Sequence, residues 1–113
     1  THTPDQIKNL CIQALEEIKA VNIIALNVSR LTSITDFMII SSGTSTAHVK
    51  SIFNQLKETL KLNHIEILTV EGLESAQWVL CDVADVVVHI MLPDTREYYG
   101  LEKIWTIEEC TSA

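Results

Sequence analysis

Asp82 and Asp85 come closest to a catalytic pattern in this chain. Paired carboxylates can hold a divalent cation for phosphoryl transfer when both side chains reach the same face of a strand. These two aspartates are three residues apart across a predicted turn, so their side chains diverge, and Asp85 is better explained as a turn residue. The sequence holds no D-x-D pair. We therefore expect neither a metal site nor a cofactor.

His89 is the second residue whose type could do chemistry. A general base needs an acid that orients it and a nucleophile within reach. Asp82 or Asp36 could lie near, but no serine or cysteine pattern completes a triad. We therefore interpret His89 as a hydrogen-bonded surface histidine.

The segment 41–45, with the sequence SSGTS, joins a predicted strand to a predicted helix and could offer backbone N–H groups to an anion. It has neither the lysine of a P-loop nor the G-x-G-x-x-G of a dinucleotide-binding fold. A capped helix entry is the favoured interpretation. A nucleotidyltransferase-like enzyme that uses the Gly43 turn and Asp82 stays open as an alternative function.

The composition favours a protein partner over nucleic acid. The 113 residues include 15 acids and 8 bases, which gives a net charge of -7, and we expect residues 1–113 to form one domain. Binding to a phosphate backbone needs clusters of lysine and arginine, so we expect no direct nucleic-acid specificity. An acidic protein meets a basic partner faster, because their potentials are complementary.

The three cysteines and the lack of long apolar runs bear on the compartment. Cys11, Cys81 and Cys110 are odd in number and have no metal-ligand spacing, so a reducing compartment fits, and we expect Cys11 and Cys81 to be buried. No run approaches the roughly 18 apolar residues of a membrane span, and the N-terminus does not resemble a targeting peptide. We expect a cytoplasmic, bacterial protein without a membrane partner.

Two strand-like runs, 78–83 and 86–92, are predicted to pair as a hairpin with a two-residue turn. One face of this hairpin is entirely apolar and belongs to the core. The other face combines large apolar and polar side chains, which is typical of a docking surface. It carries Trp78 opposite Met91, Leu80 opposite His89, and Asp82 opposite Val87.

The remaining elements follow from spacing and capping residues. Thr3, Pro4 and Gln6 predict the start of a helix that ends near Ala20, and Ser45 or Thr46 starts a second helix that ends near Asn63. We expect further strands over residues 23–28, 36–42 and 65–70, and the last two of these should run parallel to each other. A polar link should follow over residues 94–100, and then a short helix over residues 101–107 with Trp105 facing inward. The predicted fold is α/β: a two-layer, mixed five-stranded sheet with helices mainly on one face.

Four stretches of the chain carry a family resemblance: DFMIISSGTSTAHV (36–49), VEGLE (70–74), WVLCDVADVVVH (78–89) and REYYGLEKIW (96–105). In order and spacing they resemble the ribosomal silencing factor family, also called the Iojap family. In this family a glycine usually stands where this chain has Ala84, in the hairpin turn. Because glycine suits positive φ, we expect a somewhat different or slightly strained turn here.

The resemblance implies a fold like a minimal nucleotidyltransferase domain without catalytic acids, and so no enzyme activity. It implies binding to the large ribosomal subunit through ribosomal protein fourteen, which blocks joining of the small subunit and represses translation when nutrients are short. Similar proteins in organelles assist large-subunit assembly, a second alternative.

On this basis we expect the mixed face of the hairpin to meet the partner. Without its partner such a face can also self-associate, so a homodimer is a further expectation. The expected apolar anchors are Trp78, Leu80 and Met91, and the expected polar contacts are Asp82, His89, Glu71 and Asp36.

Overall fold

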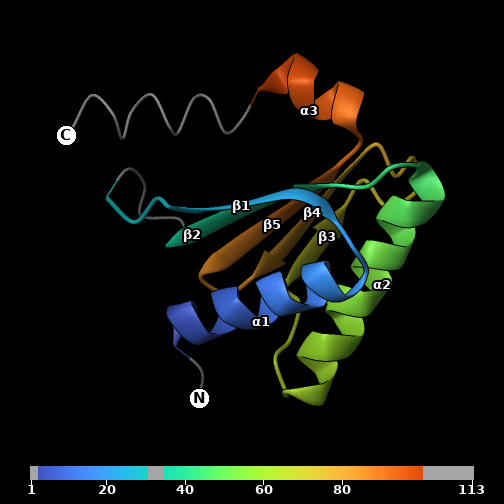
Figure 1. Ribbon diagram of the computed structural model, residues 1–113. Helices are drawn as coiled ribbons and strands as arrows, with labels where there is room; N and C mark the ends of the chain where they lie inside the picture. Colours follow the sequence, from blue (N-terminus) through green and yellow to red (C-terminus); the bar gives the residue numbers. More distant parts are fainter. Residues whose placement is uncertain (1–2, 31–34, 101–113) are drawn as a thin grey trace.

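A computed structural model describes residues 3–30 and 35–100. The described residues form a five-stranded sheet with the strand order β1-β2-β5-β4-β3, in which β2 and β5 are the only neighbouring strands that run parallel (Figure 1). The elements are α1 (Pro4–Glu17), β1 (Val21–Asn27), β2 (Phe37–Ser42), α2 (Thr46–Leu62), β3 (Thr69–Glu71), β4 (Trp78–Val83), β5 (Val86–Met91) and α3 (Pro93–Tyr99).

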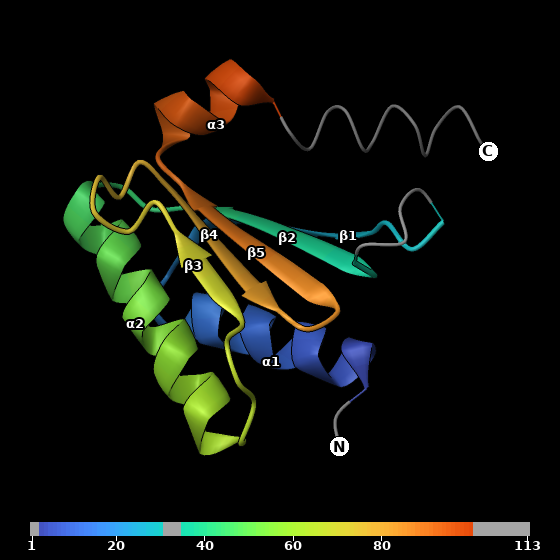
Figure 2. The same ribbon diagram turned by 180° about the vertical axis from the view of Figure 1, so that it is seen from behind.

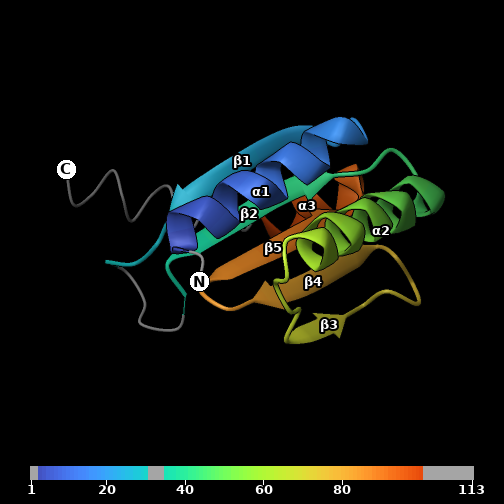
Figure 3. The same ribbon diagram turned by 90° about the horizontal axis from the view of Figure 1, so that it is seen from below.

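The two long helices, α1 and α2, cover the same face of the sheet, which we call the α1/α2 face (Figure 3). The short helix α3 lies on the other side, at the end of the sheet that β5 reaches (Figures 1 and 2). We call this second side the α3 face. The prediction of a mixed five-stranded sheet with helices mainly on one face is confirmed.

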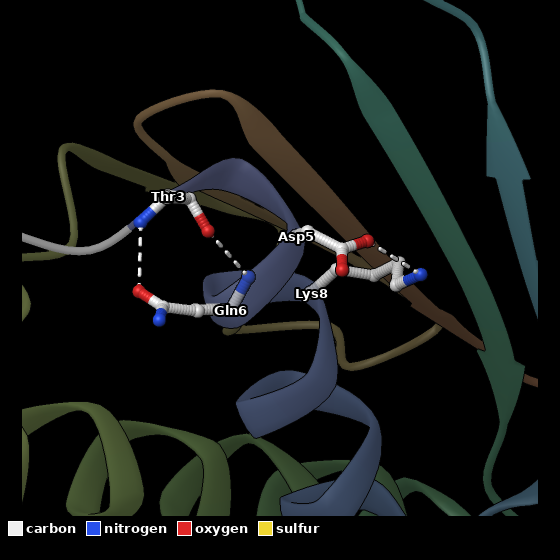
Figure 4. Close-up of polar contacts among 4 residues, drawn as sticks. All are labelled: Thr3, Asp5, Gln6 and Lys8. Carbon is white, nitrogen blue, oxygen red and sulfur yellow. Dashed lines mark hydrogen bonds and ion pairs between the residues drawn. The ribbon is translucent and has the colours of Figure 1, made fainter.

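The first helix starts where the sequence predicts. The backbone N–H of Gln6 donates to the Thr3 hydroxyl over 3.2 Å, and the backbone N–H of Thr3 donates to the Gln6 side chain over 3.0 Å, which completes a capping box (Figure 4). The same figure shows an ion pair of 3.1 Å between Lys8 and Asp5, one helical turn apart. The Asp5 side chain of this pair is 67% exposed, and ion pairs so accessible to water contribute little to stability.

Both long helices end in a left-handed residue that is not glycine. Lys19 has φ 60°, and the N–H of Ala20 donates to the carbonyl of Leu15, which ends α1 three residues earlier than predicted. At the end of α2, His64 has φ 59° and the N–H of Ile65 donates to the carbonyl of Leu60. Both endings are Schellman motifs, which glycine usually marks in a sequence.

Two predictions about the second half of the chain are wrong. The third predicted strand, 65–70, is reduced to β3, and β5 and β4 lie between β2 and β3, so the expected parallel strands are not neighbours. The predicted polar link 94–100 is largely the helix α3, which has Pro93 in its first turn and ends at Gly100 in the left-handed region. The expected helix 101–107, with Trp105, lies outside the described residues.

The main core lies between the sheet and the two long helices. It takes one stripe from each helix and the inward side chains of the three central strands. Its large, fully buried members include Leu15 of α1, Ile52, Leu56 and Leu60 of α2, Ile39 of β2, Val79 of β4 and Ile90 of β5.

Candidate functional site

The β4–β5 hairpin has the predicted register at all six pairs. Its turn holds Ala84 at φ 54°, in the left-handed region. A two-residue hairpin turn needs positive φ at its first central position, which glycine adopts without strain and alanine does not. The residue in the turn thus has the positive φ that suits glycine, and the slight strain expected of alanine there stays a prediction. The register puts Trp78, Leu80, Asp82, His89 and Met91 together on the α3 face.

Burial divides these five residues into two groups. Trp78, Leu80 and Asp82 of β4 are half-buried, so part of each side chain is accessible. His89 is 4% exposed and Met91 is fully buried. The prediction that His89 and Met91 offer contacts at the surface is wrong. The physical reason is their strand: β5 is the central strand of the sheet, and on this face only its residue nearest the turn, Val87, stays half-buried.

A second, smaller core accounts for the burial of Met91. Met91 packs on the α3 face with Val28, Met38 and Ile40, and Trp78 packs against this group from β4. Alternation along β5 predicts which side chains share a face, but it does not predict that this face has a core of its own.

His89 supports Trp78 from below the surface. The indole Nε1–H of Trp78 donates to Nδ1 of His89 over 2.9 Å. Nδ1 therefore carries no proton, and the neutral imidazole carries its proton on Nε2. Burial lowers the pKa of His89 from 6.5 to about 4, because desolvation disfavours the charged ring. The histidine is hydrogen-bonded as predicted, but it is not on the surface.

The accessible residues form a strip along one edge of the sheet. Glu71 of β3 is directly opposite Leu80 of β4 and is exposed. Opposed residues of antiparallel strands point to the same face, so Glu71 lies beside Trp78, Leu80 and Asp82. We call these four residues the β4 strip. The structure brings them together as the sequence predicts.

Asp36 does not belong to the β4 strip. It precedes β2, and its backbone N–H donates to the carbonyl of Asp85 in the hairpin turn over 2.9 Å. The turn lies at the opposite end of β4 from Trp78. A partner that contacts Trp78 would have to extend along the whole hairpin to reach Asp36.

Sequence reasoning missed two aromatic residues of α3. The ring of Tyr99 is 4.8 Å from the ring of Trp78, centroid to centroid, and Tyr98 meets Tyr99 edge to face at 5.0 Å. The exposed fractions are 82% for Tyr98 and 51% for Tyr99. The signal that could have found them is the helix α3 itself, since Pro93 and Gly100 are start and stop residues.

Arg96 fixes α3 across the end of the sheet. Its guanidinium donates to the Ser42 hydroxyl over 3.0 Å and to the carbonyl of Val21 over 3.4 Å. Arg96 is 7% exposed. These contacts run to β2 and β1, whereas Tyr99 touches β4, so α3 bridges three strands.

The arrangement around Gly43 is that of a helix entry. The hydroxyl of Ser45 accepts from the N–H of His48, and the N–H of Thr44 donates to Nδ1 of His48 over 2.9 Å. Two backbone donors at this helix entry thus have side-chain partners in the turn or the first turn of α2. Asp82 is remote from this turn. On β5 it lies opposite Val87, and Val87 in turn lies opposite Met38 of β2. Met38 is four residues before Ser42, where β2 ends at the turn. At about 3.3 Å per residue, roughly 13 Å separate Asp82 from the turn along the strands.

The other chemically active side chains are isolated. Within residues 3–30 and 35–100, no three histidine, cysteine, aspartate or glutamate side chains are grouped to hold a metal ion. Cys11 and Cys81 are buried, as predicted. Burial raises the pKa of each thiol to about 12, with a smaller contribution from Asp82 at Cys81. Across the described part of the chain, no helix is both long and apolar enough to cross a bilayer.

Comparison with known proteins agrees with this fold. A crystal structure of a Chromobacterium violaceum protein superposes with a TM-score of 0.91 at 44% identity and covers 93% of this chain and 88% of that one. The ribosomal silencing factor RsfS of the same bacterium is 46% identical over 100 residues, which are 88% of this chain and 82% of the relative.

A mouse relative is named "Mitochondrial assembly of ribosomal large subunit protein 1"; it is 33% identical over 102 residues, and the match spans 88% of this chain and 45% of the mouse protein. The family model described as "Ribosomal silencing factor during starvation" matches residues 1–113. The chain belongs to the ribosomal silencing factor family, and a ribosome-associated role in translation follows from that membership.

Proposed function

We propose that this chain binds the large ribosomal subunit through ribosomal protein fourteen and sterically blocks association with the small subunit. Translation would thereby be repressed under nutrient limitation. The observation that carries the proposal is the β4 strip, an accessible row of apolar and acidic side chains on the face that α1 and α2 leave uncovered. Family membership supports it.

The mechanism needs no chemistry and no cofactor. Subunit joining brings two surfaces into close contact, so a folded body of 12.7 kDa on one of them obstructs it. The net charge of -7 suits a basic ribosomal protein and opposes adhesion to ribosomal RNA. The proposed site of action is the bacterial cytoplasm, since the relative of highest identity quoted above is bacterial.

Co-sedimentation of the purified chain with isolated large and small subunits tests the proposal. We expect binding to the large subunit alone and loss of joined ribosomes when small subunits are added. Leu80→Glu should weaken this binding at least tenfold, as expected for a change near the centre of an interface. Leu62→Glu is the matched control, because Leu62 is 78% exposed on α2. Equal binding by both variants would refute the β4 strip as the contact.

An assembly role is the second candidate, and the name of the mouse relative favours it. An assembly factor would bind immature large-subunit particles in preference to mature ones. Gradient fractions from growing cells separate the two: co-migration with precursor particles supports assembly, and co-migration with mature subunits supports silencing.

An enzymatic role is tested by thermal unfolding in the presence of nucleoside triphosphates and divalent ions. We expect no change in Tm, because Asp82 and the Gly43 turn lie apart. A saturable rise in Tm would restore the nucleotidyltransferase-like alternative.

Self-association is a further proposal for the same surface. Because Met91 is buried, Leu80 of the β4 strip is the better residue to change. Light scattering measures the molar mass of the wild type and of Leu80→Glu. A wild-type dimer that becomes a monomer in the variant would support a homodimer whose formation competes with ribosome binding. Equal masses would remove this idea.

A further inference from the structure

A hollow of about 400 Å³ lies between the start of β4 and α3. It adjoins the β4 strip, because Trp78 belongs to both. We call it the aromatic cradle. It is lined by Trp78, Tyr98, Tyr99, Asp94, Ser75, Gln77 and Thr95.

The lining of the aromatic cradle has the chemistry of a cation site. Aromatic rings are negative on their faces and attract a cation placed over them. The rings of Trp78, Tyr99 and Tyr98 follow one another at centroid distances of 4.8 and 5.0 Å. Among the lining residues given above, Asp94 is the only charged one, and it is exposed at the first turn of α3.

Two rings of the cradle wall, Trp78 and Tyr99, are held in place before any partner arrives. His89 accepts the indole N–H of Trp78 from below, and Tyr99 packs against the indole ring. Arg96 anchors α3, which carries both tyrosines. Binding to a site held in this way orders few side chains, so little conformational entropy is lost.

We propose that the aromatic cradle binds an arginine side chain of a basic protein partner. The inference rests on the proposed function, which supplies such a partner. A guanidinium is planar, stacks on aromatic faces and is weakly hydrated, and the Asp94 carboxylate in the lining of the same hollow is a candidate acceptor for its donors. A lysine ammonium is more strongly hydrated. An apolar side chain would give the Asp94 carboxylate no partner, and a phosphate would be repelled by it.

The first test uses N-acetyl-arginine methylamide as the probe and the full chain. The readout is the indole N–H signal of Trp78 in a nitrogen–proton spectrum, assigned by its loss in Trp78→Phe. We expect a saturable shift with the arginine compound, a smaller one with the lysine compound and none with the norleucine compound. Equal shifts with norleucine, equal shifts with lysine, or no shift with arginine would each overturn the inference.

Two pairs of variants locate the binding. Asp94→Asn should weaken the arginine titration about threefold to tenfold, in the range expected for an exposed charge pair combined with a cation–π contact. Glu97→Gln is the matched control: it removes a carboxylate from the same helix, outside the aromatic cradle. Tyr99→Leu should abolish the shift, whereas Tyr99→Phe keeps the ring and should retain it.

The large subunit provides the second arm. If the wild type binds the large subunit and Asp94→Asn weakens this binding while Glu97→Gln does not, the aromatic cradle is part of the interface. If arginine titrates normally but the wild type does not bind the subunit, the proposed function fails and the arginine site stands. If the wild type binds the large subunit, but arginine causes no shift and Asp94→Asn does not weaken subunit binding, only the arginine inference fails.

Discussion

The two faces of the sheet differ in the size of the hydrophobic cores that cover them. Seventeen described side chains are buried in the cluster under α1 and α2, whereas four are buried in the cluster on the α3 face. Burial of apolar area is the main favourable term in folding. The α1/α2 face thus supplies most of the stability, and on the α3 face Trp78, Leu80 and Asp82 stay partly accessible.

The largest expected effect comes from the deep core. Leu56→Ala removes a fully buried side chain and should lower the free energy of unfolding by about 3 kcal/mol. Leu80→Ala, on the half-buried strip, should lower it by less than about 1 kcal/mol. Urea unfolding measures both. Similar losses would mean that the two faces contribute alike.

The next largest effect is a pH dependence of the free energy of unfolding that arises from His89 on the α3 face. The pKa of His89 is lowered to about 4 from 6.5, so above pH 6.5 the folded and unfolded chains both hold neutral histidine. As the pH falls from 6.5 to 4 the unfolded chain is protonated first, which reduces stability by up to about 3 kcal/mol.

His89→Gln isolates this contribution. Glutamine can still accept from the indole of Trp78 but does not titrate, so the variant should lose less stability between pH 6.5 and pH 4 than the wild type. Asp82 and Glu71, the titratable side chains of β4 and β3 on the same face, remain in both proteins. Parallel stability curves for the two proteins would contradict the assignment.

A change to Trp78 separates binding from folding. Trp78→Ala should weaken large-subunit binding by more than about tenfold, while the chain stays folded with a loss of roughly 1–2 kcal/mol. Leu26→Ala is the matched control, because Leu26 packs against the same small core from β1. It should lose similar stability and keep its binding. An unfolded Trp78→Ala chain would make Trp78 a core residue.

The smallest effect concerns the hairpin turn. Alanine at φ 54° is strained by about 1 kcal/mol, and glycine relieves that strain but adds freedom to the unfolded chain. Ala84→Gly should therefore raise the free energy of unfolding by about 0.5 kcal/mol. A decrease measured by thermal unfolding would show that the turn tolerates alanine without strain.

Local patterns predicted most of the fold. The capping box at Thr3, the cap at Ser45 and the β4–β5 register all depend on residues that are close in the sequence. The ends of α1 and α2 were harder to predict, because Lys19 and His64 stand where glycine is expected. The short β3 reflects its position at the edge of the sheet, where all three residues are exposed.

The candidate site was predicted only as a face. Alternation placed Trp78, Leu80 and Asp82 correctly beside His89 and Met91, but the burial of the last two depends on strands far away in the sequence. The tyrosines of α3 reach the site because Arg96 bonds to residues of β1 and β2. No pattern within one segment contains that information.

The central parallel pair also governs how the chain reaches its native state. β4 and β5 are adjacent in the sequence, but β5 pairs with β2 through residues that are 49 positions apart, such as Ser41 and Ile90. Closing so long a loop is slow, since entropy is lost before the contacts form. We expect the pairing of β2 with β5 to occur at the rate-limiting step of folding, after the β4–β5 hairpin has formed.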